Sequence, residues 1–266
     1  DQKPFFAGTY FPKYGGYGRF GLMDLLDRVA YLWKNNREEL LKAGNQITVA
    51  INQEQTGTGK KPDRQLVERA YSQLTQRFDH KWGGFGAAPK FPTPHNLLFL
   101  LRYADTMQES NALKMVEVTL EDMARGGIFD HIGGGFSRYS TDEMWLVPHF
   151  EKMLYDNALL LIAYDKAYQH TKKESFADPA DRTAGYILRE LTDEEGGCYC
   201  GQDADSDGVE GKYYVFTPEE VKTVLGEENG EEFCRLYDIT DAGNFEGKSI
   251  PNRIHTSENG SDINDP

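Results

Sequence analysis

The stretch from Gly126 to Leu161 places the strongest constraint on how this chain can fold. Its first part, as far as Val147, is rich in glycine: Gly126, Gly127, Gly133, Gly134 and Gly135. Glycine inside a helix costs about 1 kcal/mol relative to alanine, so this part is predicted to be a loop. After Pro148, apolar residues recur at helical spacing: Phe150, Leu154, Ala158 and Leu161. This pattern predicts one helix over 149–170, with the proline at its first turn.

Polar side chains gather in the same stretch. The loop part holds Asp130, His131, Arg138, Tyr139, Asp142 and Trp145. On a helix that begins near Pro148, His149, Lys152 and Asp156 would fall within roughly 60° of arc, away from the apolar stripe. A face with an imidazole, an ammonium group and a carboxylate is either solvated or lines a polar cavity, and the neighbouring aromatic residues favour the cavity. We therefore expect a functional site here.

Length and charge limit the classes of protein that remain. The chain has 266 residues and a net charge of −14, which permits one large domain or two smaller ones. No stripe of lysine and arginine is present, so nucleic acid is not predicted as a partner. No apolar run reaches the roughly 20 residues of a membrane span. Because the chain begins with Asp, it reads as a piece of a longer protein.

The three cysteines do not form a disulfide framework. Cys198 and Cys200 lack histidine partners for a metal and are not spaced as a Cys-X-X-Cys redox pair. We therefore predict a reducing, cytoplasmic location, no metal site at these cysteines and no cofactor.

The order of predicted elements indicates helical hairpins after a short α/β beginning. Lys3–Phe11 is predicted as a strand, Phe20–Ala43 as a helix and Asn52–Pro62 as a linker. Further helices are expected over 63–78, 96–107, 112–125, 149–170 and 176–191, followed by a strand over 213–216, two short helices to Tyr237 and an irregular end over 243–266.

A glycine–aromatic segment follows a predicted helix three times. The three segments are Trp82–Phe85, Gly133–Phe136 and Gly196–Tyr199. Glycines stop helices commonly, which accounts for each segment singly. Their spacing and the polar residues that follow them favour a repeat of stacked helical hairpins.

Two polar features have competing explanations. The segment from Asp203 to Gly208 matches the first half of a calcium loop, but Tyr214 stands where such a loop has a bidentate glutamate. A hydrogen-bonded acidic loop that brings Asp203 or Asp205 to a cavity is the preferred interpretation. Three histidines lie at predicted loop–helix junctions: His95, His131 and His149. Helix capping or packing would explain each of them singly, whereas a shared functional role would explain why all three occupy such positions.

Four segments of the chain resemble a known family. They are KPFFAGTYFP, WGGFGAAPKFPTPHNLLFLL, GGIFDHIGGGFSRYSTDEMWLVPHFEKMLYDNALLL and DADSDGVEGKYYVFTPEE. They are similar to the thioredoxin-domain-containing, spermatogenesis-associated protein family. The resemblance implies a mainly α-helical chain: residues 1–52 as the C-terminal remnant of an α/β thioredoxin-like domain, and residues 53–266 as a partial (α/α)₆ toroid of the six-hairpin glycosidase type.

The resemblance also sets limits on activity. The redox centre of the family's thioredoxin-like domain would lie before Asp1, so thiol–disulfide activity is not transferred to this chain. The chain would also end before the toroid closes. Toroids similar to this one, such as those of N-acylglucosamine 2-epimerase and cellobiose epimerase, place polar residues from their loops at the mouth of a funnel that binds sugars.

Two functional hypotheses follow. The first is a carbohydrate site for epimerisation, isomerisation or hydrolysis, with catalytic candidates His149, His131, Asp156 and Glu151. Its substrate-binding candidates are Arg138, Tyr139, Trp145, Lys152, His95, Trp82, Asp203 and Asp205. The second hypothesis is a non-catalytic platform that binds a ligand or a protein beside a thioredoxin-like domain. Convergence of the polar groups on a pocket would favour the first, and their use in caps and ion pairs the second.

Overall fold

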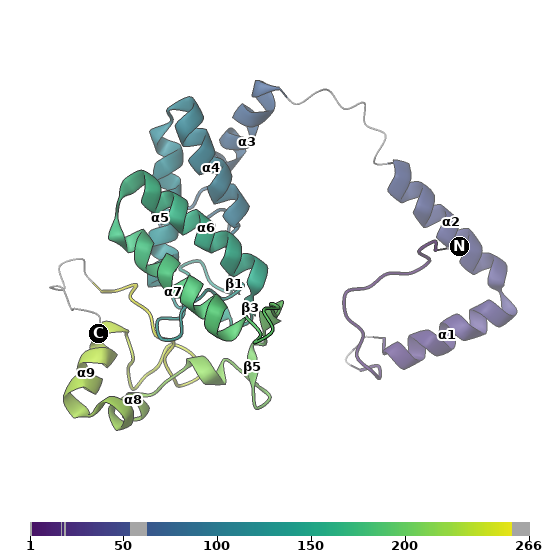
Figure 1. Cartoon of the computed structure of the whole chain (residues 1–266). Helices are drawn as coiled ribbons and strands as arrows, with labels where there is room; N and C mark the ends of the chain where they lie inside the picture. Colours follow the sequence, from purple (N-terminus) through teal and green to yellow (C-terminus); the bar gives the residue numbers. More distant parts are fainter. Residues whose placement is uncertain (1, 17, 19, 54–62, 257–266) are drawn as a thin grey trace. The chain divides into compact units, whose positions relative to one another are not determined.

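The computed structural model describes residues 2–16, 18, 20–53 and 63–256, and within them the fold is mainly α-helical (Figure 1). The described chain divides into two compact units, Asp1–Asp63 and Arg64–Pro266. The prediction of a mainly helical chain built from hairpins is confirmed. Most of the predicted linker over 52–62 lies outside the described residues, and the assignment of 1–52 and 53–266 to two domain types stays a prediction.

The first unit differs from its prediction in two places. Instead of one helix over 20–43 it contains two, α1 (Leu22–Asn35) and α2 (Arg37–Gln53). Asn36 separates them with a non-helical φ of −148°, and its side-chain amide bonds Glu39 in the first turn of α2. The segment Lys3–Phe11 is not a strand, since strands need a hydrogen-bonded neighbour and it forms no ladder within the described residues.

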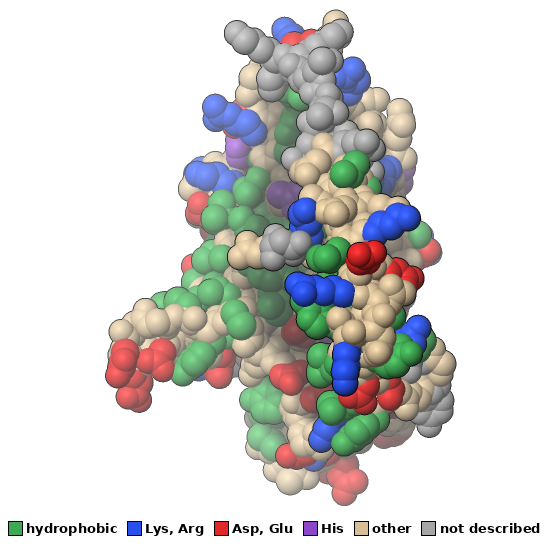
Figure 2. All heavy atoms as spheres, turned by 90° about the vertical axis from the view of Figure 1, so that its right-hand side faces the viewer, with side chains coloured by type: hydrophobic (Ala, Val, Ile, Leu, Met, Phe, Trp, Pro, Cys, Tyr) green, Lys and Arg blue, Asp and Glu red, His purple; other side chains and the backbone are tan. Residues whose placement is uncertain are grey.

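Hydrophobic side chains of this first unit lie on its surface. No residue of α1 is buried, although the helix is amphipathic. The exposed residues include Phe20, Leu26, Tyr31, Trp33 and Ile51. In the view of Figure 2, hydrophobic side chains reach the surface among charged ones.

The second unit is a series of helical hairpins. Its helices are α3 (Arg64–Arg77), α4 (Pro94–Met107), α5 (Ser110–Arg125), α6 (Leu154–Thr171), α7 (Glu174–Glu190), α8 (Pro218–Leu225) and α9 (Glu227–Leu236). Consecutive helices pack in pairs, α4 with α5, α6 with α7 and α8 with α9, and α4 also packs on α6. The apolar faces of α3 to α7 form a core around Leu100, Leu120, Phe136, Trp145 and Tyr164, and α8 and α9 have a separate cluster around Val221 and Cys234. None of the described helices is long and apolar enough to cross a membrane.

The helix predicted over 149–170 begins later than expected, at Leu154. The residues before it are extended: β2 (Pro148–His149) pairs with β1 (Tyr139–Ser140), and β3 (Lys152–Met153) pairs with β4 (Gly201–Gln202). The predicted helical face of His149, Lys152 and Asp156 is therefore wrong. Side chains of an extended segment alternate instead, so Phe150 and Lys152 are buried while His149 and Glu151 are partly exposed.

The predicted strand over 213–216 is also wrong for most of its length. Lys212–Tyr214 forms a 3₁₀ turn, η1, and only Phe216 makes a bridge, to Ser249. Before it, β5 (Asp205–Ser206) and β6 (Val209–Glu210) form a small hairpin. The irregular end is confirmed for its described part, 243–256, and the rest lies outside the described residues.

The three glycine–aromatic segments form loops that are closed in the same way, although the third is one residue shorter. Each loop is closed by an antiparallel bridge: Phe78 with Phe85, Phe129 with Phe136, and Thr192 with Cys198. In each, the N–H of an aspartate donates across the loop, from Asp79 to Gly84, from Asp130 to Gly135 and from Asp193 to Gly197. These equivalent contacts confirm the predicted repeat.

A buried lysine stabilises the first two of these loops. Lys90 Nζ lies 2.6 Å from Asp79 Oδ2, and Lys152 Nζ lies 2.7 Å from Asp130 Oδ2. Each ammonium group also donates to a backbone carbonyl, that of Glu143 or Gly134. The other carboxylate oxygen of each aspartate accepts two backbone N–H groups of its own loop. In the third loop, Asp193 instead bonds the exposed Tyr199 hydroxyl at 2.7 Å.

Successive hairpins are joined by short bridges that follow one rule. A residue that precedes a helical hairpin pairs with a residue that follows the glycine–aromatic loop at the end of that hairpin. Lys90, before α4 and α5, pairs with Ser140, and Lys152, before α6 and α7, pairs with Gln202. The bridge between Phe216 and Ser249 extends the same relation past α8 and α9. Each hairpin is thus tied to the one that follows it.

Mutation of the buried lysine should lower the stability of the fold more than mutation of the exposed tyrosine in the third loop. Lys152→Met leaves the Asp130 carboxylate buried without its cation, so we expect it to lower the free energy of unfolding by about 3–5 kcal/mol. Tyr199→Phe removes the exposed equivalent contact in the third loop and should cost much less, because water replaces the lost hydrogen bond. Urea unfolding at pH 7 measures both, and equal losses would contradict a structural role of the buried pair.

Candidate functional site

Four polar side chains and one tyrosine meet on the outward face of the β1–β2 hairpin. We call Arg138, Tyr139, His149, Glu151 and Glu210 the histidine cluster. Arg138, Tyr139 and His149 belong to or adjoin the paired strands, Glu151 follows β2, and Glu210 lies on β6. Because Phe150 and Lys152 take the inward positions, the alternate residues His149 and Glu151 point outward.

Polar contacts hold the cluster together. Nδ1 of His149 is 2.7 Å from Oε1 of Glu210, and its Nε2 is 3.8 Å from Oε2 of Glu151. The Arg138 guanidinium donates to the same Glu151 oxygen at 3.0 Å. The imidazole therefore lies between two carboxylates, one of which is shared with an arginine. This arrangement fixes the ring and surrounds it with groups that bond hydroxyls.

A ladder of aromatic rings runs beside these charges. Phe91 stacks on Tyr139 with ring centroids 4.8 Å apart, and Tyr139 stacks on His149 at 5.1 Å. Phe91 is 45% exposed, so the outer end of the ladder is open to a ligand. The cluster therefore combines an accessible apolar face with charged hydrogen-bonding groups.

Asp156 lies near the cluster in the first turn of α6. Burial raises the pKa of its carboxyl to about 6; Arg138 opposes this shift and Glu151 adds to it. Its Oδ2 is buried and has no hydrogen-bond partner among the described residues. Asp156 is thus a carboxyl that titrates closer to neutral pH than an ordinary aspartate, next to Arg138 and Glu151.

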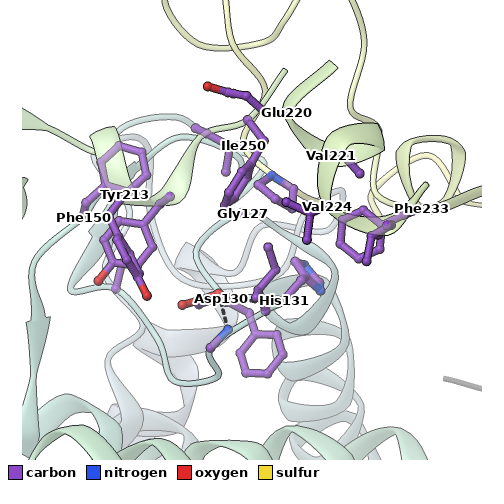
Figure 3. Close-up of a pocket in the computed structure, with 18 residues that line it drawn as sticks. Gly127, Asp130, His131, Phe150, Tyr213, Glu220, Val221, Val224, Phe233 and Ile250 are labelled. Atoms are coloured by element: carbon purple, nitrogen blue, oxygen red, sulfur yellow. Dashed lines mark hydrogen bonds between the residues drawn. The ribbon is translucent and has the colours of Figure 1, made fainter. Parts of the chain in front are cut away.

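A separate apolar pocket lies between the 127–137 loop and the α8–α9 hairpin (Figure 3). Its lining includes Asp130 and His131. Burial lowers the pKa of His131 to about 4, so the ring is neutral at physiological pH, and its Nε2 is 3.0 Å from the Gly126 carbonyl oxygen. His131 therefore does not lie with His149 in the histidine cluster.

Several predicted site residues have internal contacts instead. Lys152 is buried on Asp130 and over the rings of Tyr186 and Tyr214, at 4.5 and 4.9 Å. Trp145 is fully buried, and its indole N–H donates to the Trp82 carbonyl. Their predicted contacts with a substrate are not possible in this conformation, because neither side chain reaches the surface. Trp82 is half-buried under Lys81.

The remaining candidates are exposed. His95 lies on the first turn of α4, and the described contacts do not join it to the cluster. Asp203 and Asp205 are exposed beside the β5–β6 hairpin, and the described residues contain no group of side chains able to hold a metal ion. That hairpin brings Glu210 to His149 instead of bringing Asp203 or Asp205 there.

The sequence analysis missed two members of the site. Phe91 belongs to the KFPTP motif and could have been found as an aromatic residue between a lysine and a proline. Glu210 lies in the acidic segment that follows Asp203. No local signal relates it to His149, since 61 residues separate them.

The chain is similar to known proteins along most of its length. The family model Thioredox_DsbH, a protein of unknown function (DUF255), matches residues 1–52. Spermatogenesis-associated protein 20 of Homo sapiens is 40% identical over 94% of this chain and 35% of its own length. The uncharacterized protein B0495.5 of Caenorhabditis elegans is 34% identical over 94% of this chain and 37% of its own.

Solved structures with some similarity include sugar-converting enzymes. Cellobiose 2-epimerase from Bacillus thermoamylovorans has a TM-score of 0.46 and 15% identity over 53% of this chain and 42% of its own. A sugar epimerase from a ruminal bacterium has a TM-score of 0.44 and 16% identity over 65% and 55%. The sequence relatives are more informative than these distant likenesses. The chain spans about a third of the length of the relatives named above, and it belongs to the thioredoxin-domain-containing, spermatogenesis-associated protein family.

Proposed function

We propose that the second unit binds a carbohydrate at the histidine cluster. The observation that carries this proposal is the ladder of Phe91, Tyr139 and His149, which has an exposed ring, Phe91, at one end. At its other end, His149 contacts Glu210 and Glu151, and Glu151 also bonds Arg138. A sugar has an apolar C–H face and an edge of hydroxyls, so it fits a ring with carboxylates and a guanidinium next to it. The solved structures named above leave the proposal untested.

Binding is better supported than catalysis. Arg138, His149, Glu151 and Glu210 are engaged in ion pairs with one another, as the platform hypothesis expects. The cluster nevertheless keeps its hydroxyl-binding groups partly exposed, with 42% of the Arg138 side chain and 47% of the Glu210 side chain accessible. These groups can exchange partners with a ligand without unfolding the hairpin.

Catalysis is a second candidate because of Asp156. A carboxyl with its pKa raised to about 6 can give or take a proton near neutral pH. In this role Asp156 would exchange a proton with the sugar, and His149 would orient it. Epimerisation or isomerisation next to a carbonyl is the reaction class that such a group serves.

Carbohydrate binding predicts loss of affinity when the ladder is shortened. For a mono- or disaccharide that binds saturably, Phe91→Ala and Tyr139→Ala should each weaken the affinity by about tenfold. Each variant removes ring stacking worth about 1 kcal/mol or more. Calorimetric titration with a panel that includes cellobiose and mannose measures this. The control Tyr199→Ala removes a ring of similar exposure outside the cluster and should leave affinity unchanged. Equal affinities for all four proteins would refute the site.

Proton transfer predicts exchange with solvent. If the cluster epimerises or isomerises mannose or cellobiose, the hydrogen at C2 should be replaced by deuterium in D₂O, which NMR detects as a lost signal. Asp156→Asn should abolish the exchange and leave sugar affinity within about threefold. Binding without any exchange by the unmodified chain would leave the platform as the function.

The raised pKa of Asp156 also predicts a pH-dependent stability. Its pKa is raised from 3.8 to about 6, so the folded state loses stability as pH rises from about 4 to above 6. Asp156→Asn stays neutral and should be more stable than the unmodified chain at pH 7 by about 1 kcal/mol after allowance for solvent screening, with no gain at pH 4. Thermal melts at the two pH values measure this, with exposed Glu219→Gln as the control. A gain of the same size at both pH values would contradict the shifted carboxyl.

A further inference from the structure

The pocket of Figure 3 is a second cavity with walls of a different chemistry. Its volume is about 440 Å³, within the range of small-molecule sites. One wall comes from the loop with Phe129 and His131, and the other from Val221 and Val224 on α8 with Phe233 on α9. Phe150, Tyr213 and Ile250 lie across the remaining side. Segments that are distant in sequence thus line one apolar space.

The charged groups in its lining are already paired. Asp130 Oδ2 bonds Lys152, and its Oδ1 accepts from the N–H groups of Ile132 and Gly133. Glu220 at the rim bonds Lys248 and Thr217. The lining residues, all in the described part of the chain, include no lysine or arginine. An anion would face two carboxylates, and a cation would have to displace a paired lysine, so the walls favour a neutral ligand.

His131 supplies one directed polar contact. Its ring is neutral, and its Nε2 lies 3.0 Å from the Gly126 carbonyl oxygen, which only accepts hydrogen bonds. Nε2 therefore carries the ring proton, and Nδ1 is left as an acceptor. Among the described residues, the hydrogen bond of the ring is the one from Nε2 to Gly126. A ligand with a hydroxyl or N–H group can make that bond.

We propose that this pocket binds a neutral small molecule that has an aromatic or branched apolar body and one hydroxyl or N–H donor, which bonds Nδ1 of His131. A volume of about 440 Å³ fits a molecule of this size, whereas a helix or strand of another protein would need an extended groove. The site is separate from the histidine cluster, so it does not depend on the proposed carbohydrate site.

Two matched probes test the acceptor in the full 266-residue chain. 2-Naphthol is neutral at pH 7 and carries one hydroxyl donor, whereas 2-methoxynaphthalene has a similar body and no donor. In fluorescence titrations, 2-naphthol should bind saturably and about threefold to tenfold more tightly than the ether, the value of one hydrogen bond. His131→Phe should remove this preference, and His170→Phe, on α6 and outside the lining, should keep it.

A second pair of variants tests the location. Val224 is 81% exposed at the mouth of the pocket, so Val224→Trp should be tolerated by the fold and should weaken both probes at least fivefold. Leu188→Trp, on α7 and 72% exposed, lies outside the lining and should change neither affinity. Nuclear Overhauser contacts between 2-naphthol and the Val224 methyl groups in the unmodified chain give a readout that needs no variant.

Three results would overturn the proposal. The first is no saturable binding of either probe, including the case in which sedimentation shows a second copy of the chain over the pocket. The second is unchanged affinity in Val224→Trp together with no contact to the Val224 methyl groups. The third is a preference for 2-naphthol that survives in a folded His131→Phe variant. Sugar binding at the histidine cluster is measured separately and is expected to be the same in all these variants.

Discussion

The contact between Lys152 and Asp130 is the one on which the second unit depends most. The lysine reaches inward from an extended segment, bonds the carboxylate and the Gly134 carbonyl, and lies over the ring of Tyr186 from α7. The carboxylate in turn orders its own loop through two backbone N–H groups. One ammonium group therefore fixes a loop, a strand and a helix together. Lys90 and Asp79 repeat the loop and strand parts of this arrangement one hairpin earlier.

Because residues 148–153 are extended, this segment contributes both to the interior of the second unit and to the histidine cluster on its surface. Because side chains alternate along it, Lys152 and Phe150 serve the interior, and His149 and Glu151 form the histidine cluster outside. A helix would have placed His149, Lys152 and Asp156 on one face and left no residue to order the 127–137 loop. The same segment thus separates the proposed carbohydrate site from the apolar pocket, to which Phe150 contributes.

Features with a local cause were predictable from the sequence, and features made by distant residues were not. Apolar periodicity located the helices of the second unit, and the spaced glycine–aromatic segments located the repeated loops. The start of α6 was misplaced because Pro148 suits a first helical turn as well as a strand, and its partner Ser140 lies across a loop. Phe150 fits the helical spacing but packs on Ala204 and Ile250. The link from His149 to Glu210 has no sequence signal.

Three bridges pair a residue with a partner that comes after the following helical hairpin: Lys90 with Ser140, Lys152 with Gln202, and Phe216 with Ser249. During synthesis on the ribosome, each hairpin therefore emerges before the strand that completes it. Its open edge must wait until the next loop leaves the exit tunnel. Assembly of this unit then proceeds from the N-terminal hairpin onward, and a pause in translation just before one of these loops would expose the preceding edge to aggregation or to chaperones.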